Sequence, residues 1–95
     1  MYSRNAKNSF KLVFIKEGDF LLDAVVVGIV IQRMREEKRL SQEVLSGLIG
    51  IGRTHLSAIE RGERKPTLET FFKISDALEI RPSLLMAEIE KELEK

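Results

Sequence analysis

The chain has 95 residues, enough for one small domain but not for two that each bury a core. It contains no cysteine and a single histidine, His55, which excludes a disulfide framework, a thiolate or histidine-rich metal site and a cysteine nucleophile. Apolar residues make up 43% of the chain and charged residues 33%, a balance that excludes a disordered tail and fits a compact helical domain. The composition therefore argues against an enzyme, and we expect neither a cofactor nor a metal ion.

The formal net charge is only +1, but the charges are unevenly distributed along the chain. Residues 33–65 carry eight basic and five acidic side chains, whereas residues 66–95 carry four and seven. A basic middle third suits a partner rich in phosphate. The densest apolar run, Ala24–Ile31, falls far short of the roughly 20 residues of a membrane span, and no signal peptide precedes it. We therefore expect a soluble, cytoplasmic protein without a membrane partner.

Residues 1–22 are predicted to form an extension ahead of the domain. Phe10–Ile15 is β-prone, and Glu17–Asp19 is a turn signal before a second apolar triplet, which favours a short β-hairpin arm. The hydrophobic period then becomes helical. It predicts a first helix over Asp23–Lys38, with Asp23 as its N-cap.

The middle of the chain contains two short helices in a helix-turn-helix pattern. Ser41 is the predicted N-cap of a helix that ends at Gly50, and a further helix covers Arg53–Arg61 and ends at Gly62. Gly50 can adopt the positive φ that a tight turn between the two helices requires. Two short helices joined by three or four residues around a glycine are typical of DNA-binding domains.

Two more helices complete the predicted domain. Thr67 caps a helix over Leu68–Leu78, and a last helix opens at Pro82 or Ser83 and ends in a charged stretch at Lys95. Helices and strands do not alternate, so a parallel sheet is not expected. The predicted fold is all-α, with five helices in residues 23–95.

The stretch from about Val27 to Met86 resembles the Cro/repressor-type (XRE) family of helix-turn-helix regulators. The matching residues are Gly28, Ile31, Met34, Arg35, Leu40–Glu43, Leu45, Gly50, Ile51, Leu56, Ser57, Ile59–Gly62, Pro66–Leu68, Ile74, Ala77 and Leu78. Within the family, Arg53–Arg61 is similar to the recognition helix of restriction–modification controller proteins.

The resemblance implies a five-helix, lambda-repressor-like domain that binds a near-palindromic site in double-stranded DNA as a homodimer. It also implies that Gln42 touches a backbone phosphate and that Arg35 and Glu60 form a partly buried ion pair between the first and third helices. Three positions depart from the family pattern, and the first is Val30, which stands where the first helix often has a basic residue. Gly52 replaces the usual Ser or Thr cap of the recognition helix, and Glu79 stands where a glycine is common.

The candidate DNA-contacting residues lie on the recognition helix, in the loop after it and at the start of the preceding helix. Small and hydrogen-bonding side chains on the outer face of the recognition helix would let it approach the floor of a groove, where Arg53 and Thr54 reach base edges. The alternative is that these are ordinary solvated residues, and for Arg61 both readings stay open. The full set is Gln42, Arg53, Thr54, His55, Ser57, Arg61, Arg64 and Lys65.

Two apolar features lie outside the family pattern. A C-terminal stripe of Leu84, Leu85, Ile89 and Leu93 is expected to form a two-fold dimer interface, the alternative being a place in the core of the chain itself. The first helix is apolar nearly all round, and we expect Phe10–Leu22 to cover its outer side, within the subunit or swapped across the dimer.

Together these patterns predict a transcriptional regulator that binds a pseudo-palindromic operator as a homodimer. The alternative is a protein-interaction module, such as an antitoxin or a coactivator, that uses the same scaffold. No nucleophile–base pair and no site for a small-molecule ligand is evident in the sequence.

Overall fold

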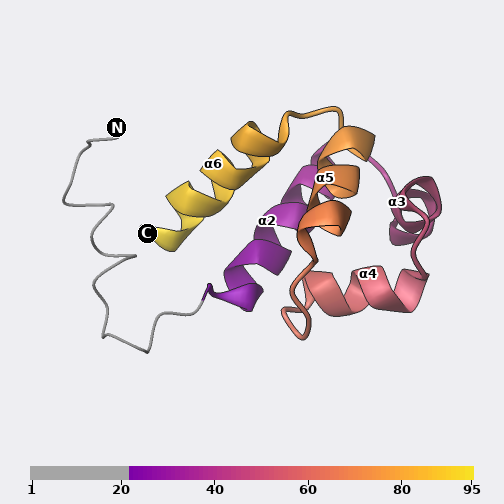
Figure 1. Cartoon of the computed structure of the whole chain (residues 1–95), viewed down its shortest axis with the longest axis horizontal. Helices are drawn as coiled ribbons and strands as arrows, with labels where there is room; N and C mark the ends of the chain where they lie inside the picture. The colour runs from indigo at the N-terminus through magenta and orange to yellow at the C-terminus, as the bar shows by residue number, and fades with distance from the viewer. Residues whose placement is uncertain (1–21) are drawn as a thin grey trace.

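The computed structural model describes residues 22–95, which form five α-helices and no strand (Figure 1). In chain order these are α2 (Ala24–Glu37), α3 (Gln42–Ile49), α4 (Arg53–Glu60), α5 (Leu68–Ala77) and α6 (Pro82–Leu93). The all-α, five-helix prediction is confirmed, with helix ends within about two residues of those expected. The predicted β-hairpin arm lies outside the described residues, except for Leu22.

Three predicted N-caps are present. The side chains of Asp23, Ser41 and Thr67 each accept a hydrogen bond of 3.0 Å from a backbone N–H group two or three residues further along their helix. Gly52 precedes α4 and offers no such bond. At the other end of α3, Gly50 has a φ of 75°, the left-handed conformation predicted for the turn. Local chemistry therefore accounts for most of the helix boundaries.

The connection between α5 and α6 turns at a residue that is not glycine. Glu79 has a φ of 59°, a left-handed backbone conformation that costs most side chains about 1–2 kcal/mol. The departure from the family pattern at this position therefore leaves the backbone turn in place.

The helices are arranged so that α4 lies on the outside of the molecule. α2 packs against both α4 and α6, while α3 packs against α4 and α5, and α5 against α6. Figure 1 shows α3 and α4 at one end of the molecule, with α6 beside α2 at the other. One side of α4 is therefore held by α2 and α3, and its other side is left to solvent.

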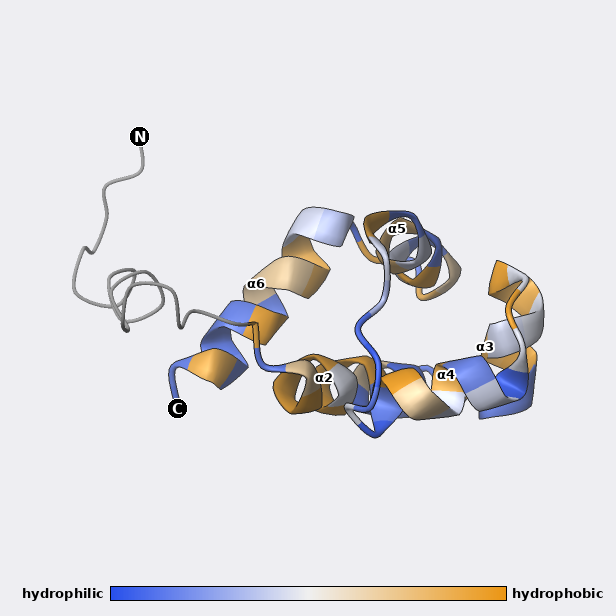
Figure 2. Cartoon of the chain, turned by 60° about the horizontal axis from the view of Figure 1, so that its bottom comes forward, coloured by the Kyte–Doolittle hydropathy of each residue, from blue (hydrophilic) through white to orange (hydrophobic). Residues whose placement is uncertain are grey.

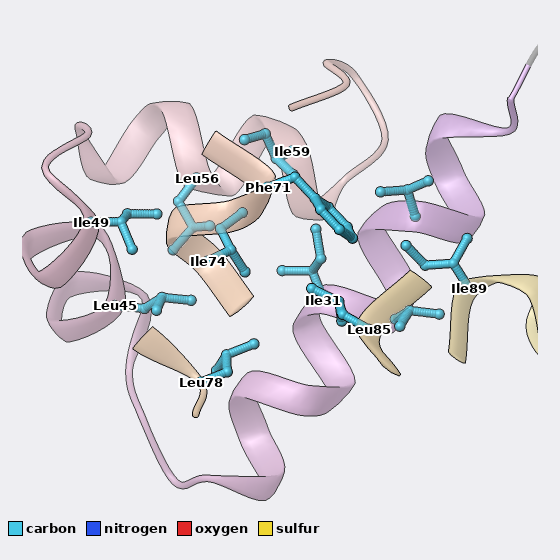
Figure 3. Packing of buried hydrophobic residues seen from close by; sticks show 12 residues of the cluster. Ile31, Leu45, Ile49, Leu56, Ile59, Phe71, Ile74, Leu78, Leu85 and Ile89 are labelled. Atoms are coloured by element: carbon cyan, nitrogen blue, oxygen red, sulfur yellow. The ribbon is translucent and has the colours of Figure 1, made fainter. Parts of the chain in front are cut away.

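One hydrophobic core joins all five helices (Figure 3). Each buried side chain of this size contributes about 1.5–3 kcal/mol through removal of its apolar surface from water. The buried apolar residues are Val27, Val30, Ile31, Leu45, Ile49, Leu56, Ile59, Phe71, Ile74, Leu78, Leu85 and Ile89.

The structure corrects the predicted dimer stripe on α6. Leu85 and Ile89 have exposed fractions of 0% and 1%, because they close the core against α2 and α5. Side chains already buried within the chain cannot form an interface with a second copy, so the prediction was wrong for these two. Leu84 is 54% exposed, and Leu93 is half-buried.

A glycine sets the distance between α2 and α4. A Cβ atom added to Gly28 would lie 2.4 Å from the carbonyl oxygen of Ile59 and 2.5 Å from that of Glu60. Contacts this short with backbone atoms cannot be relieved by turning a side chain. Gly28 therefore allows the two helix backbones to touch, and this contact orients α4.

Candidate nucleic-acid interface

The outer face of α4 carries the polar residues predicted for it. Arg53 and Thr54, in the first turn, are exposed, while His55 and Ser57 are half-buried. Leu56, Ile59 and Glu60 are buried on the opposite side. Figure 2 shows hydrophilic residues at the end of α4 that adjoins α3. The helix thus presents small and hydrogen-bonding groups to solvent, with Arg53 at its N-terminal end.

The predicted ion pair between Arg35 and Glu60 is present and connects the buried side of α4 to α2. The guanidinium donates to both oxygens of the Glu60 carboxylate, from Nε to Oε2 at 2.7 Å and from Nη2 to Oε1 at 3.0 Å. It also donates to the carbonyl oxygen of Leu40 at 2.7 Å. The hydrogen bonds that Arg35 donates to Glu60 raise the pKa of Arg35 against the opposing effect of burial. Because the geometry is bidentate, this ion pair fixes the rotation of α4 relative to α2.

Gln42 joins the same network, which sequence reasoning did not predict. Its Nε2 donates to Glu60 Oε1 at 2.8 Å, so the first residue of α3 is tied to the last residue of α4. A primary amide has two N–H donors, and this bond uses one of them. The second N–H has no acceptor within residues 22–95 and can donate to a group of another molecule. Gln42 and Arg53 line one open hollow together with Ser41 and Glu43.

At its C-terminal end, α4 carries a second arginine–glutamate pair, and this one is exposed. Arg61 donates to both oxygens of Glu63, at 3.0 and 2.9 Å, and to the hydroxyl oxygen of Ser57. The hydrogen bonds from Arg61 lower the pKa of Glu63, and in return Glu63 raises the pKa of Arg61. The predicted contact residues Ser57 and Arg61 are therefore engaged with each other and with a carboxylate.

The other basic residues near α4 have no such partner. Arg53, Arg64 and Lys65 form no ion pair with another residue of the described part of the chain, and all three are exposed. Cations on α5 and α6 are instead paired with carboxylates, as in Lys73–Glu69 and Lys91–Glu88. Arg39 and Arg81 also form no ion pair within residues 22–95, so three of the five cations without such a partner lie at the start of α4 and in the loop after it. An anionic partner would meet their positive charge there.

Two other features, a cluster of metal-binding side chains and a membrane-spanning helix, are absent from residues 22–95. No group of three or more metal-binding side chains occurs there, and none of the helices in this range combines the length and the apolar character that a bilayer-spanning segment needs.

Comparison with known proteins agrees with this geometry. The helix-turn-helix family model HTH_3 matches residues 31–85. The control protein C.MunI from a Mycoplasma species is 43% identical over 63 residues, which cover 65% of this chain and 85% of that protein.

Two solved structures of restriction–modification controller proteins are also similar. C.AhdI from Aeromonas hydrophila is 37% identical with a TM-score of 0.65, over 68% of this chain and 98% of that one. Wild-type C.Esp1396I is 31% identical with a TM-score of 0.72, over 79% and 96%. The chain therefore belongs to the Cro/repressor-type (XRE) helix-turn-helix family of DNA-binding transcriptional regulators, in which restriction–modification controller proteins are among its relatives.

Proposed function

We propose that this protein regulates transcription by binding a pseudo-palindromic operator as a homodimer. The observation that carries the proposal is the outer face of α4, where small polar side chains lie between cations that have no ion-pair partner among the described residues. An exposed helix whose other side packs against α2 and α3 can enter a major groove without steric conflict. The similarity to controller proteins supports the same function.

In this proposal the residues around α4 divide their roles by position. Arg53 and Thr54, in the first turn, read base edges. The second N–H of Gln42 and the side chains of Arg64 and Lys65 meet backbone phosphates, which contribute affinity but little specificity. Binding should therefore weaken steeply as salt concentration rises.

A homodimer would place two copies of α4 in successive major grooves, about 34 Å apart. Phe72 on α5 and Leu84 on α6 are both more than half exposed, and exposed apolar side chains of this size favour self-association. Leu93 stays with Leu84 in the proposed interface, whereas Leu85 and Ile89 are left out because they are core residues.

The test is selection of bound sites from a random DNA pool, followed by affinity measurements on the selected site. Replacement Arg53→Ala should cost about 1–3 kcal/mol there and relax the base preference at one position of each half-site. Lys91→Ala is the matched control, because it removes the same charge from α6. An equal loss of affinity for selected and random DNA would mean that Arg53 contacts only phosphate. An unchanged affinity would contradict the proposal that Arg53 on α4 recognises bases.

A second candidate function is binding to a protein partner, as in an antitoxin or a coactivator. Val44 and Leu48 lie one helical turn apart on α3, and both are at least half exposed. Substitution of both by polar residues separates the two functions, since operator binding should persist while capture of a protein partner would be lost.

A further inference from the structure

A small apolar hollow opens between α2, α5 and α6, next to the loop that precedes α5. Its volume is about 160 Å³, and seven of its eight lining residues are apolar. Figure 3 shows Phe71 and Ile89, from two of its walls, pointing toward one another. The lining residues are Leu22, Val27, Lys65, Pro66, Leu68, Phe71, Met86 and Ile89.

The size and chemistry of the hollow suit one aromatic ring. A cavity of about 150 Å³ lined by aliphatic and aromatic side chains stays dry and accepts benzene. The rim is also apolar, since Leu68 is 71% exposed and Met86 is 38% exposed. Such a rim is unfavourable in water unless another apolar group covers it.

Leu22, the first residue that the structure describes, forms part of the wall of the hollow and packs against the core. Residues 20–22 are an apolar triplet of the predicted β arm, and side chains two residues apart in an extended segment lie on the same side. An extended chain would therefore carry Phe20 on the side of Leu22. Two residues span about 7 Å, which brings a phenyl ring within reach. Phe14 and Phe10 lie eight and twelve positions before Leu22.

We propose that Phe20 of the same chain inserts its ring into this hollow and thereby anchors the N-terminal extension to the domain. The anchor covers the apolar hollow between α2, α5 and α6. Because Lys65 and Pro66 form one wall, it also ties the extension to the loop that carries Arg64 and Lys65. This inference concerns the free protein and does not depend on DNA binding.

The test uses the methyl resonances of protein labelled with ¹³C-methyl methionine. Met86 lines the hollow, whereas Met34 packs elsewhere against the core and reports whether the fold is intact. Replacement Phe20→Leu removes a ring but keeps an apolar side chain. It should shift the Met86 methyl signal and leave the Met34 signal in place, while the matched control Phe14→Leu should shift neither.

A Met86 signal that does not respond to Phe20→Leu would overturn the proposal. A mixed sample tests whether the ring comes from the same chain. Labelled wild-type protein is combined with excess unlabelled Phe20→Leu protein and incubated until subunits exchange. The wild-type Met86 signal should stay unchanged, and a new signal matching the variant would show that the ring belongs to a second copy.

Discussion

Two arginine–glutamate pairs lie at the ends of the network around α4, and they differ in almost every physical respect. Arg35 and Glu60 have exposed fractions of 7% and 5%; they lie 25 residues apart in sequence and connect α2 to α4. Arg61 and Glu63 are exposed and only two residues apart. The first pair orients α4 within the fold, whereas the second covers part of the surface that α4 offers to a partner.

Arginine therefore serves a different purpose in each pair, according to how deeply its side chain is buried. A buried ion pair is costly to break, because the remaining charge stays in a medium of low polarity. An exposed pair is weak, because water and salt screen it and because two long side chains lose freedom when they form it. Burial therefore decides which arginine is structural and which is free to exchange its partner.

The largest expected effect comes from breaking the buried pair. Glu60→Leu strands the Arg35 guanidinium and removes the acceptor of Gln42, so the free energy of unfolding should fall by about 3–5 kcal/mol. Urea denaturation measures the loss. The double variant Arg35→Leu/Glu60→Leu should recover part of it, and a single variant as stable as wild type would contradict the structural role.

A smaller loss should follow from forcing α2 and α4 apart. Gly28→Ala places a methyl group against two backbone carbonyls and should cost about 1–3 kcal/mol. Gly47→Ala is the matched control on α3, because a Cβ atom there meets nothing within 4 Å. That variant should gain about 0.5–1 kcal/mol from helix propensity. Equal effects of the two substitutions in thermal melts would contradict the close contact.

The exposed pair should affect DNA binding rather than stability. Glu63→Gln should leave the free energy of unfolding nearly unchanged, because the pair is exposed to water and salt. It also releases Arg61 and removes a negative charge beside the proposed DNA surface, so affinity for the selected operator should rise. Fluorescence anisotropy at two salt concentrations measures the change, and a fall in affinity would mean that Glu63 positions Arg61 for DNA.

The smallest effect is a change in the titration of Glu63. Arg61 lowers the pKa of this carboxyl in the folded protein below its ordinary value of 4.5. The contribution of the pair is therefore present above that ordinary value and is lost as the pH falls through the lowered one. In Arg61→Ala the titration midpoint of Glu63 seen by NMR should return upward. An unchanged midpoint would mean that the two side chains do not pair in solution.

Much of the fold was predictable because its signals are local. A side-chain cap such as Ser41 acts on a backbone group three residues away, and the left-handed turn at Gly50 depends on that residue alone. The polar outer face of α4 followed from helical spacing in the same way. Family resemblance added the buried pair of Arg35 and Glu60, which spacing alone does not predict.

The candidate site was predicted less completely, because its contacts depend on the burial of each side chain and on the geometry of the loops. The same spacing of leucines suits a dimer interface or a core, and only the packing of α6 against α2 and α5 assigned Leu85 and Ile89 to the core. The bond from Gln42 to Glu60 joins residues 18 apart in sequence, and Glu63 lies in a loop that has no periodicity.

The amino-acid sequence by itself determined where each helix starts and stops and which face of α4 is polar, because capping and helical periodicity act over a few residues. The tertiary structure alone decided which apolar residues of α6 close the core and which cations of residues 22–95 remain without a carboxylate. Those properties depend on distances between segments far apart in the chain, and such distances exist only once the helices have packed.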